Sequence, residues 1–321
     1  MSGIDRVGLV ETTVPDPGPH QVLVESLYSA ISPGTEMRCL SGRQPGGIFP
    51  FIPGYSLVGR VVARGEGAVL REGTLVFCKG SESAGHPILW GAHMAHAVCS
   101  ESKVFALPDG VTPLGAALTK LAAIAHRGVS CARTHSGDEV AVVGLGPIGQ
   151  LAARLHTLAG GRVVAADLSP DRVALARAAG INAVVAADGL VPALAREMPR
   201  GADVVVDSTG VPSVLQQSIR LGKAKPWDDS ETEPTRLVIQ GSYAENVIFD
   251  YHEAFGRELS VHFPRDNQSR DILAVIGLLA SGKLSTADLV SEECDPGDAQ
   301  RVYSELRASK PGLLTAVFRW K

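Results

Sequence analysis

The sequence predicts an α/β protein in which a β-rich domain comes first and a parallel sheet covered by helices follows. Up to about residue 115, short alternating or β-branched runs are separated by Gly- and Pro-rich turns and show no helical periodicity. After that point, short apolar strands alternate with helical stretches, an order typical of a doubly wound parallel sheet. The length of 321 residues leaves room for about two domains.

The expected strands of the first domain alternate apolar and polar residues or are rich in β-branched ones, and they cover residues 21–28, 57–63, 75–78 and 95–99. Their irregular spacing favours a partly open β-barrel. In the second domain we expect strands at 139–143, 162–166, 203–207, 237–240 and 259–263, helices at 112–130, 170–179 and 271–280, and an exposed loop at 223–235. The tail carries a helix at 298–307 and a strand at 314–318. We expect this strand to return to the first domain, because a terminal strand is most stable when it pairs with an existing sheet.

The strongest functional signal is EVAVVGLGPIG at residues 139–149. A β-branched strand runs into three glycines, of which Gly144 allows a tight turn and Gly146 lets the backbone approach a pyrophosphate. Gly149 lets the next helix pack closely on the sheet. A second strand ends at Asp167, whose carboxylate can accept hydrogen bonds from an adenosine ribose and would repel a 2′-phosphate. This order predicts a Rossmann unit that binds NAD, and a glycine-rich turn without a ligand is the competing interpretation.

Further cofactor contacts are expected at the carboxyl ends of the strands, where an open α/β sheet binds its ligand. We expect Arg172 near the adenosine and Gln240 and Gly241 near the nicotinamide. The full predicted set is Gly144, Gly146, Pro147, Ile148, Gly149, Asp167, Arg172, Thr209, Gln240 and Gly241.

Composition and charge exclude several classes of partner. The net charge of −4 argues against a nucleic-acid or anionic-membrane surface, and no apolar run is long enough to span a membrane. The five cysteines are scattered, without a CxxC pair, which fits a reducing cytoplasm. We therefore expect a cytoplasmic protein that acts on a small molecule.

A β-rich front, a central Rossmann unit and a returning tail resemble the medium-chain dehydrogenase/reductase superfamily over nearly the whole chain. The matching segments are ISPGTE (31–36), PGYSLVG (53–59), GAHMAH (91–96), VVGLGPIG (142–149), DSTG (207–210) and VFRW (317–320). The resemblance implies a GroES-like barrel as the catalytic (substrate) domain over residues 1–115 and an NAD-binding Rossmann domain over 116–264. Residues 265–321 would form a bridging helix and the return to the catalytic domain. The first two segments look most like the branch that contains bacteriochlorophyllide 3-hydroxyethyl dehydrogenases.

The chain departs from the zinc members of this superfamily at each ligand position. Those members carry a Cys near Ser32, a Gly-His-Glu where this chain has Gly54-Tyr55-Ser56, and a Cys or Asp near Lys120. The four-cysteine lobe that holds a structural zinc in many relatives is also absent from the sequence. Because catalytic zinc needs about three protein ligands, we expect a zinc-free member without a metal.

Three residues are candidates for catalysis without zinc. Lys120 interrupts an apolar helix and could act as a base or polarise a carbonyl, or it could extend to the surface. Thr35 matches the hydroxyl that in relatives links the substrate oxygen to the nicotinamide ribose, and its alternative role is to satisfy amides in a turn. Tyr55 lies where a ligating His would be and either meets the substrate or packs.

Glu36, His93 and His96 of the first domain are interpreted as structural residues and not as catalytic or metal-binding ones. We expect Glu36 to order its loop through an ion pair rather than to act as a base. His93 and His96 would lie on opposite faces of a strand, as ordinary polar residues rather than metal ligands.

The leading hypothesis is an NAD-dependent, zinc-independent oxidoreductase that interconverts a secondary alcohol and a ketone. A zinc-free NAD(P)H enoyl or quinone reductase of the same superfamily, or a nucleotide-binding protein without catalysis, would also fit the sequence. The apolar strand at 259–263 would form the outer edge of the nucleotide sheet. Pairing with a second copy would cover that edge, so we expect a homodimer.

Overall fold

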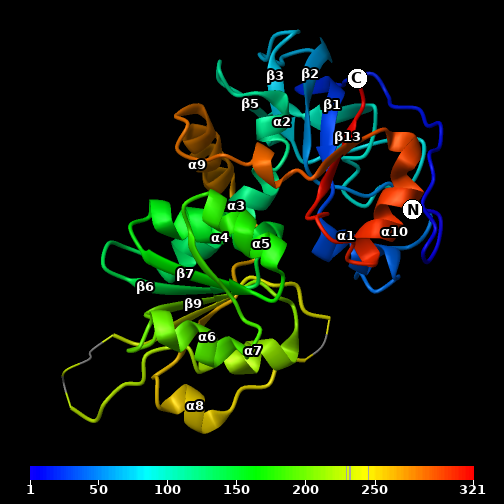
Figure 1. Cartoon of the computed structure of the whole chain (residues 1–321). Coiled ribbons are helices and arrows are strands. Elements are labelled where there is room, and N and C mark those ends of the chain that lie inside the picture. Colours follow the sequence, from blue (N-terminus) through cyan, green and yellow to red (C-terminus); the bar gives the residue numbers. More distant parts are fainter. Residues whose placement is uncertain (229, 231–232, 245) are drawn as a thin grey trace. The chain divides into compact units, whose positions relative to one another are not determined.

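The chain forms two structural units in the computed structural model, which describes residues 1–228, 230, 233–244 and 246–321 (Figure 1). Unit 1 comprises Met1–Leu121 and Ile272–Lys321, and unit 2 comprises Ala122–Asp271. The predicted boundaries lie near residues 115 and 264. In the structure the chain changes units inside helices α3 (Thr119–Ala132) and α9 (Ser269–Ala280), so a change in composition does not mark either boundary.

Unit 1 is built on a seven-stranded mixed sheet that follows the order β12-β13-β1-β2-β3-β5, with β4 paired to β1. Its strands are β1 (Gln21–Ala30), β2 (Leu57–Arg64), β3 (Leu75–Cys78), β4 (His96–Ser100), β5 (Val104–Ala106), β12 (Glu292–Cys294) and β13 (Ala316–Arg319). The first half of β1 pairs with β4 and its last residues pair with β13, while β2 lies along the other edge of β1. One strand therefore serves two sections of the sheet, which curls it into the predicted partly open barrel.

Helix α1 (Pro33–Leu40) is not predicted by the sequence, which indicates only strands before residue 112. Proline suits the first turn of a helix, but α1 buries the acid Glu36 beside Cys39 and Leu40, so it lacks a clear apolar stripe. It packs against α10 (Ala299–Arg307) from the tail of the chain. The remaining short elements of unit 1 are α2 (Pro113–Ala116), η1 (Glu101–Lys103), η2 (Ala287–Leu289) and η3 (Pro296–Asp298).

The single helix predicted over residues 112–130 is interrupted in the structure. Helix α2 ends at Ala116, and α3 begins at Thr119. Two side-chain hydroxyls bind carbonyls at the interruption: Ser56 Oγ donates to Ala117 O at 2.6 Å, and Thr286 Oγ1 donates to Gly115 O. These carbonyls would accept amide hydrogens in a continuous helix, so the contacts compete with its extension.

Unit 2 contains a six-stranded parallel sheet in the order β11-β10-β9-β6-β7-β8 (Figure 1). Its strands are β6 (Glu139–Val143), β7 (Arg162–Asp167), β8 (Asn182–Val185), β9 (Val204–Asp207), β10 (Arg236–Ile239) and β11 (Ser260–His262). Its other helices are α4 (Pro147–Leu158), α5 (Pro170–Ala178), α6 (Leu190–Glu197), α7 (Pro212–Ile219) and α8 (Tyr251–Phe255). The strand order reverses between β6 and β9, the place where an open α/β sheet binds its ligand. The predicted doubly wound sheet is confirmed.

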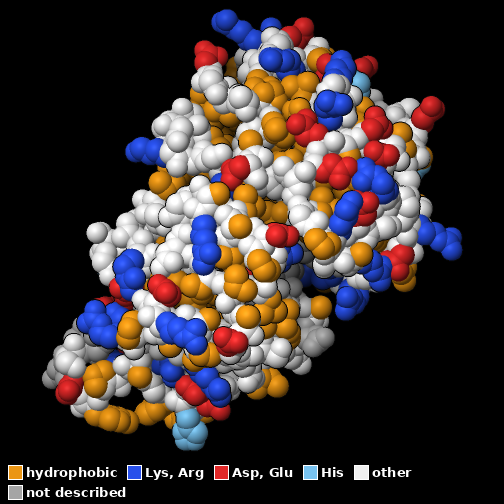
Figure 2. Space-filling model, in the orientation of Figure 1, with side chains coloured by type: hydrophobic (Ala, Val, Ile, Leu, Met, Phe, Trp, Pro, Cys, Tyr) orange, Lys and Arg blue, Asp and Glu red, His pale blue; other side chains and the backbone are white. Residues whose placement is uncertain are grey.

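Three features bear on partners. Strand β11 lies at the edge of its sheet, as expected, and the homodimer stays a prediction. On the face drawn in Figure 2, Lys and Arg side chains alternate with Asp and Glu side chains instead of gathering into one basic surface. Among the helices described, none has the length and apolar character needed to cross a membrane.

The expected loop at 223–235 includes positions 229 and 231–232, which lie outside the described residues.

Candidate functional site

The glycine loop of unit 2 folds tightly between β6 and α4. Gly144 has a φ of +85°, a conformation that favours glycine, and its N–H donates to Ala166 O on β7 at 2.9 Å. A Cβ at Gly149 would lie 1.7 Å from Gly144 O, so the start of α4 packs directly on the turn. A Cβ at Gly144 would lie 2.8 Å from Thr209 Cγ2, which brings the end of β9 against the same loop.

Gly146 differs from these two glycines because the space beside it is open. It is the N-cap of α4, with φ −63° and ψ −179°, and no described atom lies within 4 Å of an ideal Cβ there. Pro147 and Ile148 follow in the first turn of the 12-residue helix. A helix N-terminus with open space in front of it suits a pyrophosphate.

Asp167 connects the end of β7 to the glycine loop. Its carboxylate accepts hydrogen bonds from Leu145 N at 2.6 Å and from Ser169 N at 2.8 Å. Arg172 Nη1 lies 3.7 Å from the same carboxylate. The acid is therefore held at the carboxyl end of β7 beside the glycine loop, with Arg172 next to it, and its contact with a ribose stays a prediction.

Asp207, a fully buried acid to which the sequence alone assigns no role, organises the end of β9. Its carboxylate accepts from Thr209 N at 3.0 Å, from Thr209 Oγ1 at 2.8 Å and from Ser218 Oγ at 2.8 Å. Tyr243 also donates to it, and burial together with the negative charge of Asp207 raises the pKa of Tyr243 well above its ordinary value. The VVVD strand followed by Ser-Thr-Gly was the available signal for Asp207. Tyr243 gave none, because it lies 36 residues away.

Several polar atoms at this edge of the sheet are buried and lack a hydrogen-bond partner among the described residues. They include Ser208 Oγ and Gln240 Oε1. The amide nitrogen of Gln240 donates to Ile124 O at 2.7 Å, which leaves the oxygen available. Next to it, a Cβ at Gly241 would lie 2.4 Å from Gly210 N, so the two loops touch. The open space at Gly146, the acid at Asp167 and these free acceptors fit a dinucleotide.

The predicted catalytic residues of unit 1 gather around Tyr55. Its phenol bonds to Ser32 Oγ, and it lies 3.2 Å from Thr35 Oγ1. Tyr55 is buried and packs edge-on against Trp90 with ring centroids 5.2 Å apart. A phenol has one proton and each hydroxyl can both donate and accept, so Ser32, Tyr55 and Thr35 form a chain along which protons can be passed. We call these three residues the hydroxyl cluster.

Lys120 lies in the interior and not at the surface, so the surface role is excluded and a catalytic role stays a prediction. Only 3% of the residue is exposed. Its Nζ lies 5.7 Å from the centroid of the Tyr55 ring, a cation–π distance. The neighbouring Thr119 is also buried, and its hydroxyl has no partner among the residues described. Thr119 adds a polar group that the sequence analysis missed.

Glu36 and His93 form a buried pair behind the hydroxyl cluster. Glu36 has no exposed surface, and its Oε2 lies 2.9 Å from His93 Nε2. Tyr303 also donates to Glu36, and burial, followed by the charge of Glu36, raises the pKa of Tyr303 well above its ordinary value. Burial and the same carboxylate raise the pKa of Cys39 to about 12. An ion pair at Glu36 was expected, but its histidine partner was not.

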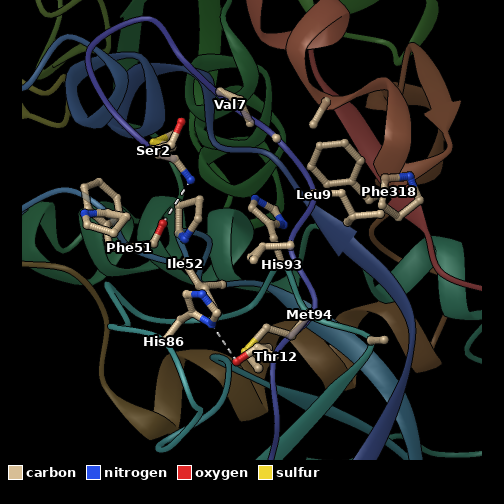
Figure 3. Close-up of a pocket in the computed structure, with 18 of the residues that line it drawn as sticks. Ser2, Val7, Leu9, Thr12, Phe51, Ile52, His86, His93, Met94 and Phe318 are labelled. Carbon is tan, nitrogen blue, oxygen red and sulfur yellow. Dashed lines mark hydrogen bonds between the residues drawn. The ribbon is translucent and has the colours of Figure 1, made fainter.

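The expectation that His93 is an ordinary strand residue is wrong. Strand β4 begins at His96, so His93 precedes it, and only 7% of the His93 side chain is exposed. The alternation rule failed because the segment is irregular at this point. His93 lies on the wall of a cavity of about 870 Å³ in unit 1, among the apolar side chains of Leu9, Ile52 and Phe318 (Figure 3). Neither Tyr55 nor Lys120 is among the residues that line this cavity.

Comparison with known proteins identifies the family. The profile described as "Alcohol dehydrogenase GroES-like domain" matches residues 18–109, and the profile "Zinc-binding dehydrogenase" matches residues 147–225. A 2-desacetyl-2-hydroxyethyl bacteriochlorophyllide A dehydrogenase from Rhodobacter capsulatus is 29% identical over 100% of this chain and 97% of its own length. The chain belongs to the medium-chain dehydrogenase/reductase superfamily. The predicted resemblance to the bacteriochlorophyllide branch is confirmed.

Two further superfamily members extend the comparison. A sorbitol dehydrogenase from Halalkalibacterium halodurans is 26% identical over 96% of this chain and 94% of its own length. The crystal structure of 2R,3R-butanediol dehydrogenase from Bacillus subtilis is 22% identical, with a TM-score of 0.85 over 99% of this chain and 98% of that one. The structural match supports the GroES-like and Rossmann architecture of the two units.

The residues of unit 1 do not fit the zinc ion that one profile name implies. At the expected ligand positions lie the hydroxyls of Ser32 and Tyr55 and the ammonium of Lys120, whereas zinc prefers Cys, His or carboxylate ligands. Across the part of the chain that the structure describes, no group of three or more His, Cys, Asp or Glu side chains could hold a metal.

The glycine loop generates a test of dinucleotide binding. Gly146→Ala should lower the affinity for NAD by at least about tenfold, because the new methyl group would occupy the place of the pyrophosphate. The melting temperature should change little, since Ala fits the backbone angles of Gly146 and would meet no described atom within 4 Å. Calorimetric titration with NAD and thermal unfolding would measure both quantities.

Two other glycines serve as controls. Gly149→Ala should destabilise unit 2, because its Cβ would lie 1.7 Å from a backbone oxygen. Gly277→Ala, in the exposed part of α9, should leave NAD affinity unchanged. An unaltered NAD affinity in Gly146→Ala would contradict the assignment.

Proposed function

We propose that the protein is an NAD-dependent oxidoreductase that interconverts a secondary alcohol and a ketone without zinc. The observation that carries this proposal is the buried hydroxyl cluster with Lys120 beside it, at positions where zinc relatives carry ligands. The similarity to a hydroxyethyl bacteriochlorophyllide dehydrogenase and to a sorbitol dehydrogenase supports the reaction class. The acid Asp167 at the end of β7 supports NAD as the cofactor.

The hydroxyl cluster would handle the proton of the reaction. When an alcohol is oxidised, its carbon loses a hydride and its oxygen loses a proton. A bound NAD supplies the hydride acceptor. Tyr55 would take the substrate proton as its own proton passes to Thr35, and Thr35, which is partly exposed, would release a proton to water.

Lys120 would supply charge stabilisation. Its ammonium is removed from water, so its field on a nearby oxygen is screened weakly. A positive charge next to Tyr55 favours the negatively charged form of the phenol and of a substrate oxygen bonded to it. In the reverse reaction the same charge would polarise the ketone.

Cofactor selectivity tests the role of Asp167. The unmodified protein should use NAD much better than NADP, because a 2′-phosphate would meet the charge of the carboxylate. Asp167→Asn removes the charge and keeps the shape, and should narrow the ratio of kcat/KM values by at least about tenfold, as should Asp167→Ala. Steady-state kinetics with both cofactors would measure the ratio. Equal use of NAD and NADP by the unmodified protein would refute the NAD assignment.

Substitution of Lys120 tests its role in charge stabilisation. Lys120→Ala and Lys120→Met should both lower kcat by roughly 100-fold while NAD affinity stays nearly constant. The pH–rate profile should lose one limb in both variants. Thr35→Val should lose less activity, because water can replace a relay hydroxyl more easily than a fixed charge.

Lys103→Met is the matched control, because the Lys103 side chain is 68% exposed and pairs with Glu82 at the surface. It should keep full activity. If Lys120→Met retains near-normal kcat and the same pH profile, Lys120 has no chemical role and Tyr55→Phe becomes the decisive variant.

Metal content provides a further test. Purified protein should contain far less than one zinc per chain by elemental analysis, and chelators should leave its activity intact, because hydroxyls and an ammonium are poor zinc ligands. Stoichiometric zinc that a chelator removes together with activity would disprove zinc independence.

A further inference from the structure

The helix that carries Thr35 is capped in an unusual way, and this leaves the Ser32 hydroxyl available. Ser32 is the N-cap of α1, yet within the described residues its side chain makes no capping hydrogen bond. Glu36 caps instead: its Oε1 accepts from Ser32 N at 2.8 Å, and its own N–H donates to Ser32 O at 2.8 Å. Because both backbone groups of Ser32 are held by Glu36, the Ser32 hydroxyl is left to bond Tyr55.

His93 holds Glu36 in this position. A carboxylate only accepts hydrogen bonds, so His93 Nε2 carries the hydrogen that is directed at Glu36 Oε2, 2.9 Å away. The other ring nitrogen, Nδ1, lies 2.8 Å from Ser29 Oγ, which itself accepts from Trp320 Nε1 at 2.9 Å. Both ring nitrogens are therefore engaged, and the orientation of the imidazole is fixed.

His93 also touches the segment that carries Tyr55. The His93 N–H donates to Pro53 O at 3.1 Å. An ideal Cβ on Gly54 would lie 2.7 Å from the His93 ring, so the ring rests against the backbone of the residue before Tyr55. Phe318 also packs edge-on against the His93 ring, with centroids 5.0 Å apart (Figure 3).

We propose that His93 is a positioning residue that sets the spacing of the hydroxyl cluster. It contacts both segments that contribute to the cluster: residues 32–36 through Glu36, and residues 53–55 through Pro53 and Gly54. Tyr55 can reach both Ser32 and Thr35 only while these segments keep their spacing. His93 itself transfers no proton to the substrate. This inference rests on the proposed function, because the spacing matters for proton transfer.

A matched pair of variants separates the two ring nitrogens. His93→Gln places an amide N–H where Nε2 was and keeps the donor to Glu36, whereas His93→Asn reaches only to the Nδ1 position and keeps the contact with Ser29. Both remove the ring from Phe318, so their losses of thermal stability should be similar. His93→Asn should lower kcat at least about tenfold with unchanged NAD affinity, and His93→Gln should stay within about threefold of the original.

Two more variants complete the experiment. His93→Phe keeps a ring against Phe318 but has no donor, and should behave like His93→Asn, so it replaces that variant if His93→Asn does not fold. His96→Asn, a change at a nearby histidine with a half-exposed side chain, should leave kcat unchanged. Equal kcat in His93→Gln and in the variants without a donor would overturn the proposal, even if all of them are less stable.

Crystal structures of the variants test the proposal without turnover. The 3.2 Å contact between Tyr55 Oη and Thr35 Oγ1 should persist in His93→Gln and be lost in His93→Asn or His93→Phe. Retention of that contact in all variants would overturn the positioning role. An unmodified protein that oxidises no secondary alcohol in a broad panel would instead refute the proposed function, and the crystallographic result would still report on His93.

Discussion

A carboxylate without access to water determines how unit 1 is assembled. Glu36 is fully buried, and an ionised carboxylate is stable in such a place only with several hydrogen-bond donors. Its donors come from Ser32, His93 and Tyr303, which are 4, 57 and 267 residues away in the sequence. The early loop, the segment before β4 and the returning tail must therefore all be in place before Glu36 can be buried. Because Glu36 holds the backbone of Ser32, and Ser32 bonds Tyr55, the arrangement of the hydroxyl cluster depends on this burial.

Unit 2 also contains a buried acid, but its hydrogen-bond donors are closer in the sequence. Asp207 is also fully buried, and its donors Thr209, Ser218 and Tyr243 lie 2, 11 and 36 residues further along the chain. The donors of Asp207 all lie in α7 or in the loops that follow β9 and β10. A buried acid thus fixes a loop in each unit, but only in unit 1 does the arrangement depend on residues from opposite ends of the chain.

This difference in range explains what the sequence could predict. The strand at 139–143, the glycine loop and Asp167 are neighbours in sequence, and their spacing alone identifies the cradle for a dinucleotide. Helix α1 and the role of His93 could not be predicted, since each depends on partners that no local period reveals. Lys120 lies between these cases: the apolar surroundings were visible in the sequence, but burial against Tyr55 required the fold.

An ammonium and a metal ion place different demands on the groups around them. A metal binds the substrate oxygen directly, and its ligands fix that oxygen. Lys120 Nζ lies 5.7 Å from the centroid of the Tyr55 ring, so in the proposed reaction its charge would act on the substrate oxygen partly through the phenol. Its effect then depends on how well the phenol is oriented, and a phenol with hydroxyl partners can rotate its proton toward either. A site of this kind needs a rigid frame more than a zinc site does. The hydrogen-bonded chain from Trp320 through Ser29, His93 and Glu36 to Ser32 provides such a frame.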